Sequence, residues 1–192
     1  MKVDFDSKKH QYKIDGVIVP GVTDILGQDT EVFKYAARKK GLADDYYAVR
    51  GTFIHLMTQK YDETGDDTKY KDHEWYGYLL AWIKFKTDNN VHLSGREIIV
   101  ASKKLMLAGT LDVLCLFNKT LWILDIKSGS ETETHKTQVS AYRLLYEQDP
   151  RLYLLPKNIG GVYLRPNGRY SFKEFKYDPY EVEYLRAKYE KK

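Results

Sequence analysis

Two aspartates and a lysine are spaced in this sequence so that they could do chemistry on a bound metal ion. Asp112 stands in one apolar run, Asp125 and Lys127 stand in a second, and Asn118-Lys119 separates the two runs. The apolar runs cover 111–117 and 121–127. Such a pattern predicts a β-hairpin. The two aspartates are equidistant from the turn, so we expect them to face each other, with Cβ atoms roughly 4.5–5.5 Å apart.

Opposed carboxylates in a sheet repel each other, so their charge needs a partner. A divalent cation between them is the simplest candidate, because carboxylate oxygens are hard ligands. Lys127 lies on the same face as Asp125, one strand repeat further along. The alternative is the exposed polar face of an amphipathic hairpin. Against this alternative, acids on an apolar face need a partner, and the other positions of that face are apolar: Leu114, Leu116, Leu121 and Ile123.

Three further features become informative only if the fold brings them to this hairpin. Gly51 and His55 lie one turn apart in a predicted helix, and Glu97 precedes an apolar pair in a predicted strand. Gln138 and Tyr142 are four residues apart on a predicted helix, so they share a face. Taken singly, each of these residues has an ordinary explanation as a structural or surface residue.

The composition predicts one globular domain with a real core. The 192 residues are 43% hydrophobic and 30% charged, which suits one domain. No run reaches the ~18 apolar residues of a membrane span, and the N-terminus lacks the apolar core of a signal peptide. Cys115 is the one cysteine, so an internal disulfide is excluded and a small buried residue is expected. We therefore expect a cytoplasmic protein without a membrane partner.

The net charge of +4 is unevenly distributed along the chain. Residues 151–192 hold ten Lys/Arg against five Asp/Glu, and seven of the 17 tyrosines. Interleaved basic and aromatic residues suit a nucleic-acid surface, because they neutralise phosphates and stack on bases. Arg165, Arg169 and Lys173 flank a predicted turn at 166–168 in this segment and are candidate DNA contacts. The alternative is a solvated face with tyrosines in the core.

The order of the predicted elements indicates one α/β domain with a central mixed β-sheet flanked by helices. Helices are predicted at 32–40, 45–62, 74–86 and 134–148, with a short helix capped by Thr23 or Asp24 and a last helix opened by Asp178-Pro179. Strands are predicted at 2–5, 12–19 with a turn at Asp15-Gly16, 95–102, 111–117, 121–127, 159–165 and 170–176. We divide the single domain, 1–192, into an N-terminal hairpin and helices (1–90), a catalytic sheet (91–148) and a basic C-terminal hairpin and helix (151–192).

The ordered set of motifs resembles the PD-(D/E)XK nuclease superfamily, and more narrowly its RecB-type exonuclease branch. That branch has a helical histidine, a Gly-x-x-Asp strand, an Asp-x-Lys strand and a Gln-x-x-x-Tyr helix, in this order. Here they correspond to His55, 109–112, 125–127 and 138–142. The segment 19–26 is similar to the opening segment of phage exonucleases and of the mitochondrial genome maintenance exonuclease, with Gly21 in place of the usual serine. The resemblance covers residues 12–146.

The resemblance implies a metal-dependent DNA exonuclease of phage or mobile-element recombination, repair or replication. It implies one or two Mg²⁺ or Mn²⁺ ions, bound by His55, Asp112, Asp125 and the main-chain carbonyl of Ile126. Lys127 would orient the attacking water or stabilise developing negative charge. By the same resemblance, Glu97 would hold a second metal or a metal-bound water, Gln138 and Tyr142 would contact DNA or support the site, and Arg50 would approach a phosphate or face solvent.

Two alternatives use the same fold: a structure-specific or restriction-like endonuclease, and a non-catalytic DNA-binding subunit. The intact acids and lysine argue against the second, because a pure binder needs no such set. Some relatives hold an iron–sulfur cluster with four cysteines, and the single cysteine here excludes that cluster. No Gly-x-x-x-x-Gly-Lys-Ser/Thr loop is present, so any motor would be another chain. The expected partner is DNA, single-stranded or with free ends, and the candidate protein partners are a recombination, single-strand-binding or helicase protein.

Overall fold

Two β-sheets organise the chain in this computed structural model, which describes residues 1–27 and 30–191. The larger sheet has the strand order β4-β5-β6-β7-β8. Its strands are β4 (His92–Ser102), β5 (Leu107–Phe117), β6 (Thr120–Lys127), β7 (Asn158–Leu164) and β8 (Tyr170–Phe175). The β6–β7 pair is parallel and the other neighbours are antiparallel. The expected α/β class with a central mixed sheet is thereby confirmed.

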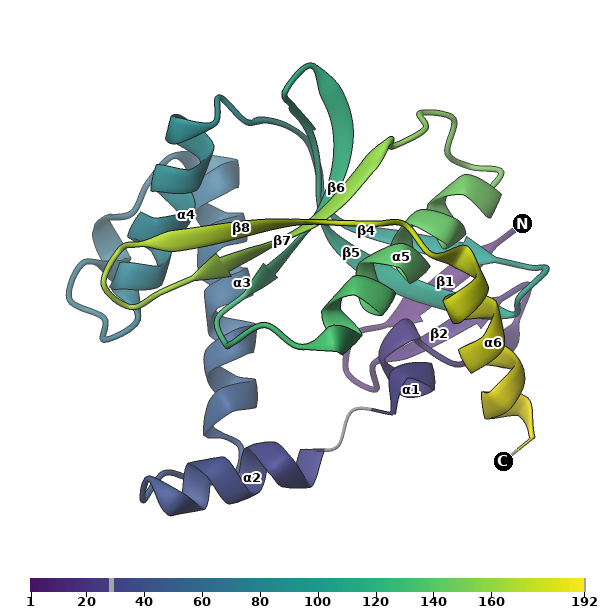
Figure 1. Cartoon of the computed structure of the whole chain (residues 1–192), viewed down its shortest axis with the longest axis horizontal. Helices are drawn as coiled ribbons and strands as arrows, with labels where there is room; N and C mark the ends of the chain where they lie inside the picture. The colour runs from purple at the N-terminus through teal and green to yellow at the C-terminus, as the bar shows by residue number, and fades with distance from the viewer. Residues whose placement is uncertain (28–29, 192) are drawn as a thin grey trace.

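Helices cover both faces of this sheet (Figure 1). One face packs against α3 (Tyr46–Thr64) and α4 (Tyr76–Asp88), with the short 3₁₀ helix Thr68–Tyr70 between them. The other face packs against α5 (Glu133–Gln148), which is flanked by α1 (Val22–Leu26) and α6 (Pro179–Glu190). A further helix, α2 (Thr30–Lys39), contacts α3. None of the helices in the described ranges is long and apolar enough to cross a membrane.

Strand β6 is buried on both faces, as strands beneath two helical layers must be. Trp122, Leu124 and Ile126 pack toward α3 and α4, whereas Ile123 packs toward α5. Cys115 of β5 is a buried free thiol, and its burial raises its pKa to about 12. This cysteine is the small core residue that the sequence predicted.

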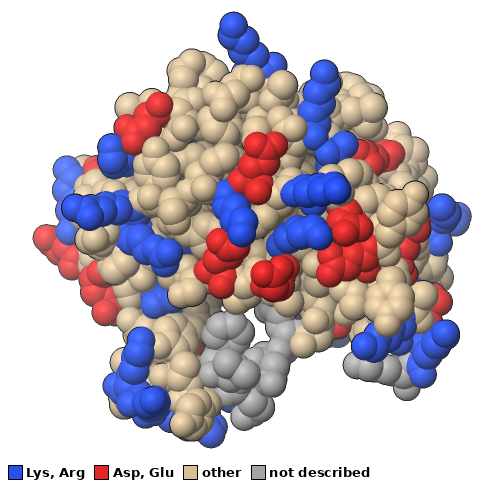
Figure 2. Space-filling model, in the orientation of Figure 1, with Lys and Arg blue, Asp and Glu red and all other residues tan. Residues whose placement is uncertain are grey.

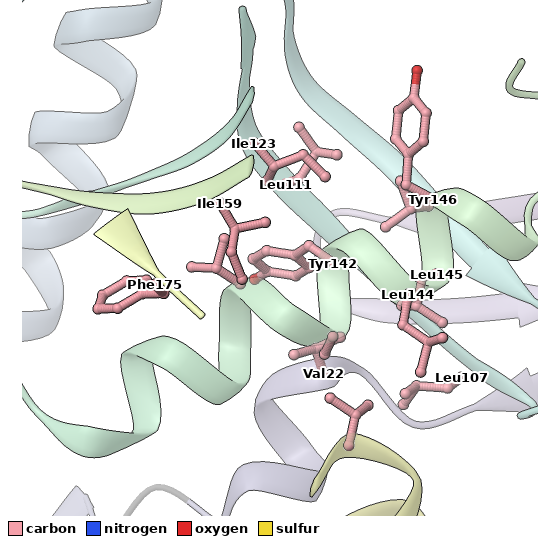
Figure 3. Close-up of a cluster of buried hydrophobic side chains, with 14 of the residues drawn as sticks. Val22, Leu107, Leu111, Ile123, Tyr142, Leu144, Leu145, Tyr146, Ile159 and Phe175 are labelled. Atoms are coloured by element: carbon pink, nitrogen blue, oxygen red, sulfur yellow. The ribbon is translucent and has the colours of Figure 1, made fainter. Parts of the chain in front are cut away.

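The apolar cluster beneath α5 fixes this helix against the sheet. Figure 3 shows Tyr142 of α5 beside Ile159 of β7, with Val22 of α1 at the edge of the same cluster. A Cβ atom at Gly109 would lie 2.9 Å from both the Tyr142 ring and the Val22 side chain. The glycine therefore permits α1 and α5 to approach β5 closely, and this approach places Tyr142 behind the predicted acids.

The N-terminal strands form a separate antiparallel sheet of three strands. They are β1 (Val3–Asp6), β2 (Gln11–Ile14) and β3 (Val17–Val19). The predicted turn at Asp15-Gly16 is confirmed, because both residues adopt left-handed backbone angles, with φ of 48° and 86°, and β2 pairs with β3 across them. Tyr12 of β2 packs with Ala101 and Ala108 of the large sheet, so this small sheet abuts the edge at which Glu97 lies.

Local turns explain which predicted boundaries are right. Asn118 and Lys119 have φ of 49° and 63°, as a type I′ hairpin requires, and the predicted register is confirmed from Val113–Leu124 to the turn. The α1 cap was predicted wrongly. Gly21 caps the helix instead, and its N–H donates to the Asp24 carboxylate at 2.7 Å. The Asp178-Pro179 start of α6 is confirmed, because the Asp178 side chain accepts from the Glu181 N–H.

Candidate active site

The two predicted aspartates lie where the β5–β6 pairing ends. The last paired residues are Val113 and Leu124. Beyond these residues the Asp112 side chain takes the place of a main-chain acceptor. Its Oδ2 accepts a hydrogen bond from the Ile126 N–H at 2.7 Å. Asp112 is 6% exposed and Asp125 is 1% exposed. Both carboxylates are therefore held at a buried fork between two strands, where a negative charge is costly without a partner.

Glu97 reaches the same place by an unusual backbone conformation. Arg96 pairs with Val113 and Ile98 pairs with Leu111, so Glu97 stands across from Asp112. Its φ of 50° lies in the left-handed region, which costs a non-glycine residue about 1–3 kcal/mol and is concentrated at functional sites. The sequence predicted an ordinary strand here. Among the described residues, Glu97 Oε1 has no hydrogen-bond partner.

His55 approaches these acids from α3 on the other side. Its Nε2 lies 2.9 Å from the main-chain oxygen of Ile126. A carbonyl can only accept, so we assign the ring proton to Nε2. The lone pair of Nδ1 then faces the acids, at 3.5 Å from Asp112 Oδ1 and 3.9 Å from Glu97 Oε1. Metal-binding histidines commonly donate their other ring N–H to a backbone carbonyl in this way.

The donor set of this cluster fits a divalent cation. One ligand atom from each of His55, Glu97 and Asp112 lies within 4.8 Å of the others. Burial alone would lower the pKa of His55, but the Asp112 charge and the Glu97 contact raise it above its ordinary value. The same negative potential favours any cation placed there. Asp125 Oδ1 and Glu97 Oε1 are buried without a hydrogen-bond partner among described residues, which leaves acceptor capacity for a metal or its water.

Lys127 is fixed beside this cluster by an ion pair and a hydrogen bond. Its Nζ lies 2.8 Å from Asp125 Oδ2 and 3.0 Å from Gln138 Oε1. Gln138 in turn donates to the Tyr142 hydroxyl at 3.0 Å. Burial and the Asp112 charge raise the pKa of Asp125 against the opposing effect of Lys127. Burial would lower the pKa of Lys127, but Asp125 and Asp112 raise it, so the ammonium form is favoured.

The structure separates the predicted DNA-contacting residues into two groups. Gln138 and Tyr142 are each 5% exposed and support Lys127. Their burial suits the supporting role, and DNA contact by them stays a prediction. Three of the four basic candidates contact the loop after β6 rather than the acid cluster. Arg50 donates to Ser128 O at 3.0 Å, Arg165 donates to Gly129 O at 3.1 Å, and Lys173 pairs with Glu131.

Arg169 is exposed at the β7–β8 turn. On the face of the molecule that Figure 2 draws, lysines and arginines are interspersed with acids rather than gathered in one basic patch. Lys173 pairs with Glu131 and Arg151 pairs with Asp149, and both acids lie outside residues 151–192. The surplus positive charge of 151–192 is thus partly compensated by neighbouring acids.

A supporting network behind His55 and Glu97 was missed from the sequence. Arg96 donates to the Thr58 hydroxyl at 3.1 Å, and Thr58 donates to the His55 carbonyl at 3.0 Å. The Asp62 carboxylate lies 3.5 Å from Arg96 Nε, and its side chain is 2% exposed. The sequence held one signal of this network: each supporting residue is close in sequence to the residue it supports, Thr58 to His55 and Arg96 to Glu97. Nothing in the sequence indicates that Thr58 and Arg96 contact each other, because they meet only through tertiary packing.

The fold and the acid cluster point to one class of protein, a metal-dependent nuclease, and comparison with known proteins agrees. A family model for the PD-(D/E)XK nuclease superfamily matches residues 68–192, which is more than half of the chain. The chain belongs to the PD-(D/E)XK nuclease superfamily, whose substrate is DNA. The matched range contains Glu97, Asp112, Asp125 and Lys127, whereas His55 precedes it.

Two other comparisons add little. The crystal structure of SSO0001 is 16% identical in sequence and covers 89% of this chain and 74% of its own, with a TM-score of 0.46. A likeness at this level carries no argument about function. A search among curated proteins found no match.

Proposed function

We propose that this nuclease is a DNA exonuclease of the RecB-type branch, acting on single-stranded DNA or on free ends. The setting we propose is phage or mobile-element recombination, repair or replication in the cytoplasm, with residues 1–192 working as one domain. A recombination, single-strand-binding or helicase protein is the proposed protein partner. The order of the histidine, Gly-x-x-Asp, Asp-x-Lys and Gln-x-x-x-Tyr motifs supports this branch.

One observation carries the proposal. His55 Nδ1, a Glu97 oxygen and an Asp112 oxygen converge from three elements, and buried carboxylate oxygens beside them lack hydrogen-bond partners among described residues. We propose that these residues, with Asp125 and the Ile126 carbonyl, hold one or two Mg²⁺ or Mn²⁺ ions. When bound, such an ion supplies Lewis acidity and lowers the pKa of a coordinated water.

We assign Lys127 the task of positioning the reacting groups. An ammonium group has three donors, and Asp125 and Gln138 hold it through two of them at most. A remaining donor can orient the attacking water or bind an oxygen of the scissile phosphate. Fixed donors aimed at developing charge stabilise a transition state without reorganising. The Gln138–Tyr142 contact keeps this donor in place.

We propose that Arg50, Arg165, Arg169 and Lys173 guide the DNA backbone past the loop after β6. Arg50 lies on α3 and Arg165 directly follows β7, and each donates a hydrogen bond to a main-chain carbonyl of this loop. Each guanidinium has five donors, so it can bind a loop carbonyl and a phosphate together. Arg169 is the most accessible of the set, since it is exposed at a turn.

One assay separates exonuclease, endonuclease and binding subunit. The protein is incubated with Mn²⁺ and either circular single-stranded DNA or the same DNA linearised and labelled at one end. We expect degradation of linear DNA from its ends and intact circles. Cut circles would show an endonuclease, and DNA binding without cleavage would show a non-catalytic module. Asp125→Asn is the matched control, because it changes one buried charge and should abolish cleavage of either substrate.

A further inference from the structure

A small pocket adjoins the acid cluster on the side of the N-terminal sheet. Its cavity measures about 180 Å³. It opens beside Glu97 and Asp112, and its walls include His10, Tyr12, Thr23 and Thr110. No residue of this N-terminal wall was assigned a function from the sequence. The pocket lies next to the place where a scissile phosphate would meet the acids, so its lining should contact the adjoining part of the substrate.

The lining indicates which part of the substrate the pocket can take. Glu97 and Asp112 belong to the proposed metal site, and among the residues that the structure describes no lysine or arginine lines the rest of the pocket. A phosphate would therefore find no cationic side chain to pair with there. The threonine hydroxyls and the Tyr12 and His10 rings suit an uncharged ligand with polar edges. The cavity is smaller than the roughly 300–1,000 Å³ of drug-sized sites, so it suits a unit no larger than one nucleoside.

The aromatic wall of the pocket is fixed in place. The Phe5 ring stacks on Tyr12 at 4.6 Å between centroids, and His10 packs its ring edge-to-face with both, at 5.4 Å and 5.7 Å. The Tyr12 hydroxyl and Thr110 Oγ1 are 2.9 Å apart, which ties this wall to β5. His10 is exposed and has a left-handed φ of 48°. The backbone thus accepts strain at the one residue that presents an accessible aromatic ring to the pocket.

We propose that this pocket holds the nucleoside next to the scissile phosphate, with the base packed against His10. This inference rests on the proposed nuclease function and names the substrate form that the function requires. A base can enter the pocket only when it has left its duplex, so the substrate at the site is single-stranded or a frayed end. Base–aromatic stacking tolerates any base, because every base has a π face. The pocket therefore recognises the presence of a base and not its identity.

The test moves one abasic nucleotide stepwise through a labelled single-stranded oligonucleotide and measures the rate of cleavage at each position. When the abasic nucleotide occupies one fixed position next to the cleaved bond, the cleavage rate of the wild-type protein should fall roughly tenfold. This is the loss expected for one base–aromatic stack. The variant His10→Asn lacks the ring and suits the backbone, because asparagine tolerates left-handed angles. It should cleave intact DNA more slowly and show no extra loss at that position.

Two further variants make the result specific. His10→Tyr restores a ring and should restore the position-dependent loss. His92→Asn removes another exposed histidine, one that pairs with Leu116 at the far end of β4, and should behave as wild type. Equal position dependence in wild type and His10→Asn would overturn the pocket assignment and leave the nuclease function intact. Failure of the wild type to cleave intact DNA would overturn the proposed function and the pocket assignment together.

Discussion

At the scale of single residues, Asp112 links the fold to the proposed chemistry. One of its oxygens accepts the Ile126 N–H, and the other faces His55 Nδ1. The sequence predicted that Asp112 and Asp125 face each other, because hairpin register follows a local rule of spacing, and this register is confirmed as far as Val113–Leu124, one step before the aspartates. It could not predict the left-handed Glu97, since that conformation depends on how β4 pairs with β5.

The first prediction concerns the acids and the lysine. Asp112→Asn, Asp125→Asn and Lys127→Ala should each lower the cleavage rate by at least about 100-fold, the size of effect seen when one fixed charge-stabilising group is lost. In the Asp112→Asn variant the amide oxygen can still accept from the Ile126 N–H, so thermal unfolding should stay cooperative. Rates are measured under single-turnover conditions. Near-normal cleavage by any one variant would remove that residue from its proposed role.

The second prediction concerns the choice of metal. Imidazole nitrogen suits Mn²⁺ better than Mg²⁺, which prefers oxygen ligands. The wild-type protein should work at least as well with Mn²⁺ as with Mg²⁺, and Ca²⁺ should bind without supporting turnover. His55→Ala should weaken activation by Mn²⁺ more than activation by Mg²⁺, because the lost ligand is the nitrogen. Equal loss with both ions, together with unchanged metal affinity by calorimetry, would make His55 a supporting residue only.

At the scale of elements, most helices and strands were predicted from periodicity, and the errors lie at their ends. Strand β5 begins at Leu107, four residues before the predicted start, and α4 begins at Tyr76 rather than at residue 74. The segment before Leu111 contains Gly109, a weak strand former, against which Val22 and Tyr142 pack too closely to leave room for a side chain. Such packing comes from distant segments, so local sequence rules could not place this boundary.

The third prediction tests the β7–β8 hairpin as a DNA surface. Neutralising Arg165, Arg169 and Lys173 together should flatten the salt dependence of DNA affinity, by about 0.7 in log–log slope for each lost phosphate contact on single strands. Arg169→Gln alone should give part of this change. Lys103→Gln is the control, because Lys103 pairs with Asp15 on the N-terminal sheet. An unchanged slope in the triple variant would mean that the hairpin does not contact DNA and that its basic residues only face solvent.

The fourth prediction concerns Asp149, which joins the end of α5 to β4. Its Oδ2 accepts from the Ala101 N–H at 3.0 Å, and Arg151 pairs with the same carboxylate. Burial raises the pKa of Asp149, but the bonds from Arg151 and Ala101 lower it below its ordinary value. A lowered folded-state pKa stabilises the fold above the unfolded pKa of about 3.9, and this stabilisation is lost as the pH falls through the folded value.

Asp149→Asn should therefore lower the free energy of unfolding by about 1–3 kcal/mol at pH 7. The difference in the free energy of unfolding between wild type and variant should narrow below about pH 4, as the wild-type carboxyl becomes protonated. Urea denaturation of both proteins at several pH values measures this difference. Asp72→Asn, which alters an exposed carboxylate, should leave the wild-type curve in place. A gap that stays constant down to about pH 2.5, well below the unfolded pKa, would show that Asp149 acts by shape and not by charge.

At the scale of the whole molecule, the large sheet brings together residues that are far apart in sequence. His55 comes from α3, Glu97 from β4, Asp112 from β5 and Lys127 from β6, and α5 supports the lysine. No local rule joins residue 55 to residue 112. Their meeting was predicted only through the resemblance of the ordered motifs to the PD-(D/E)XK superfamily, to which the chain belongs. His10 lies outside those motifs, and only the structure places it in a pocket with Asp112 and Tyr142.

The most direct test of a metal-dependent nuclease centre compares cleavage with metal binding in one pair of proteins. Wild type and Lys127→Ala are given an end-labelled single-stranded oligonucleotide with Mn²⁺ or with excess EDTA, and Mn²⁺ affinity is measured by calorimetry. We predict that the wild type cleaves the oligonucleotide with Mn²⁺ and does not cleave it in excess EDTA. Lys127→Ala should still bind Mn²⁺, because its acids and His55 remain, and should cleave at least about 100-fold more slowly. Cleavage by the wild type in EDTA, or unimpaired cleavage by Lys127→Ala, would contradict this account of the site.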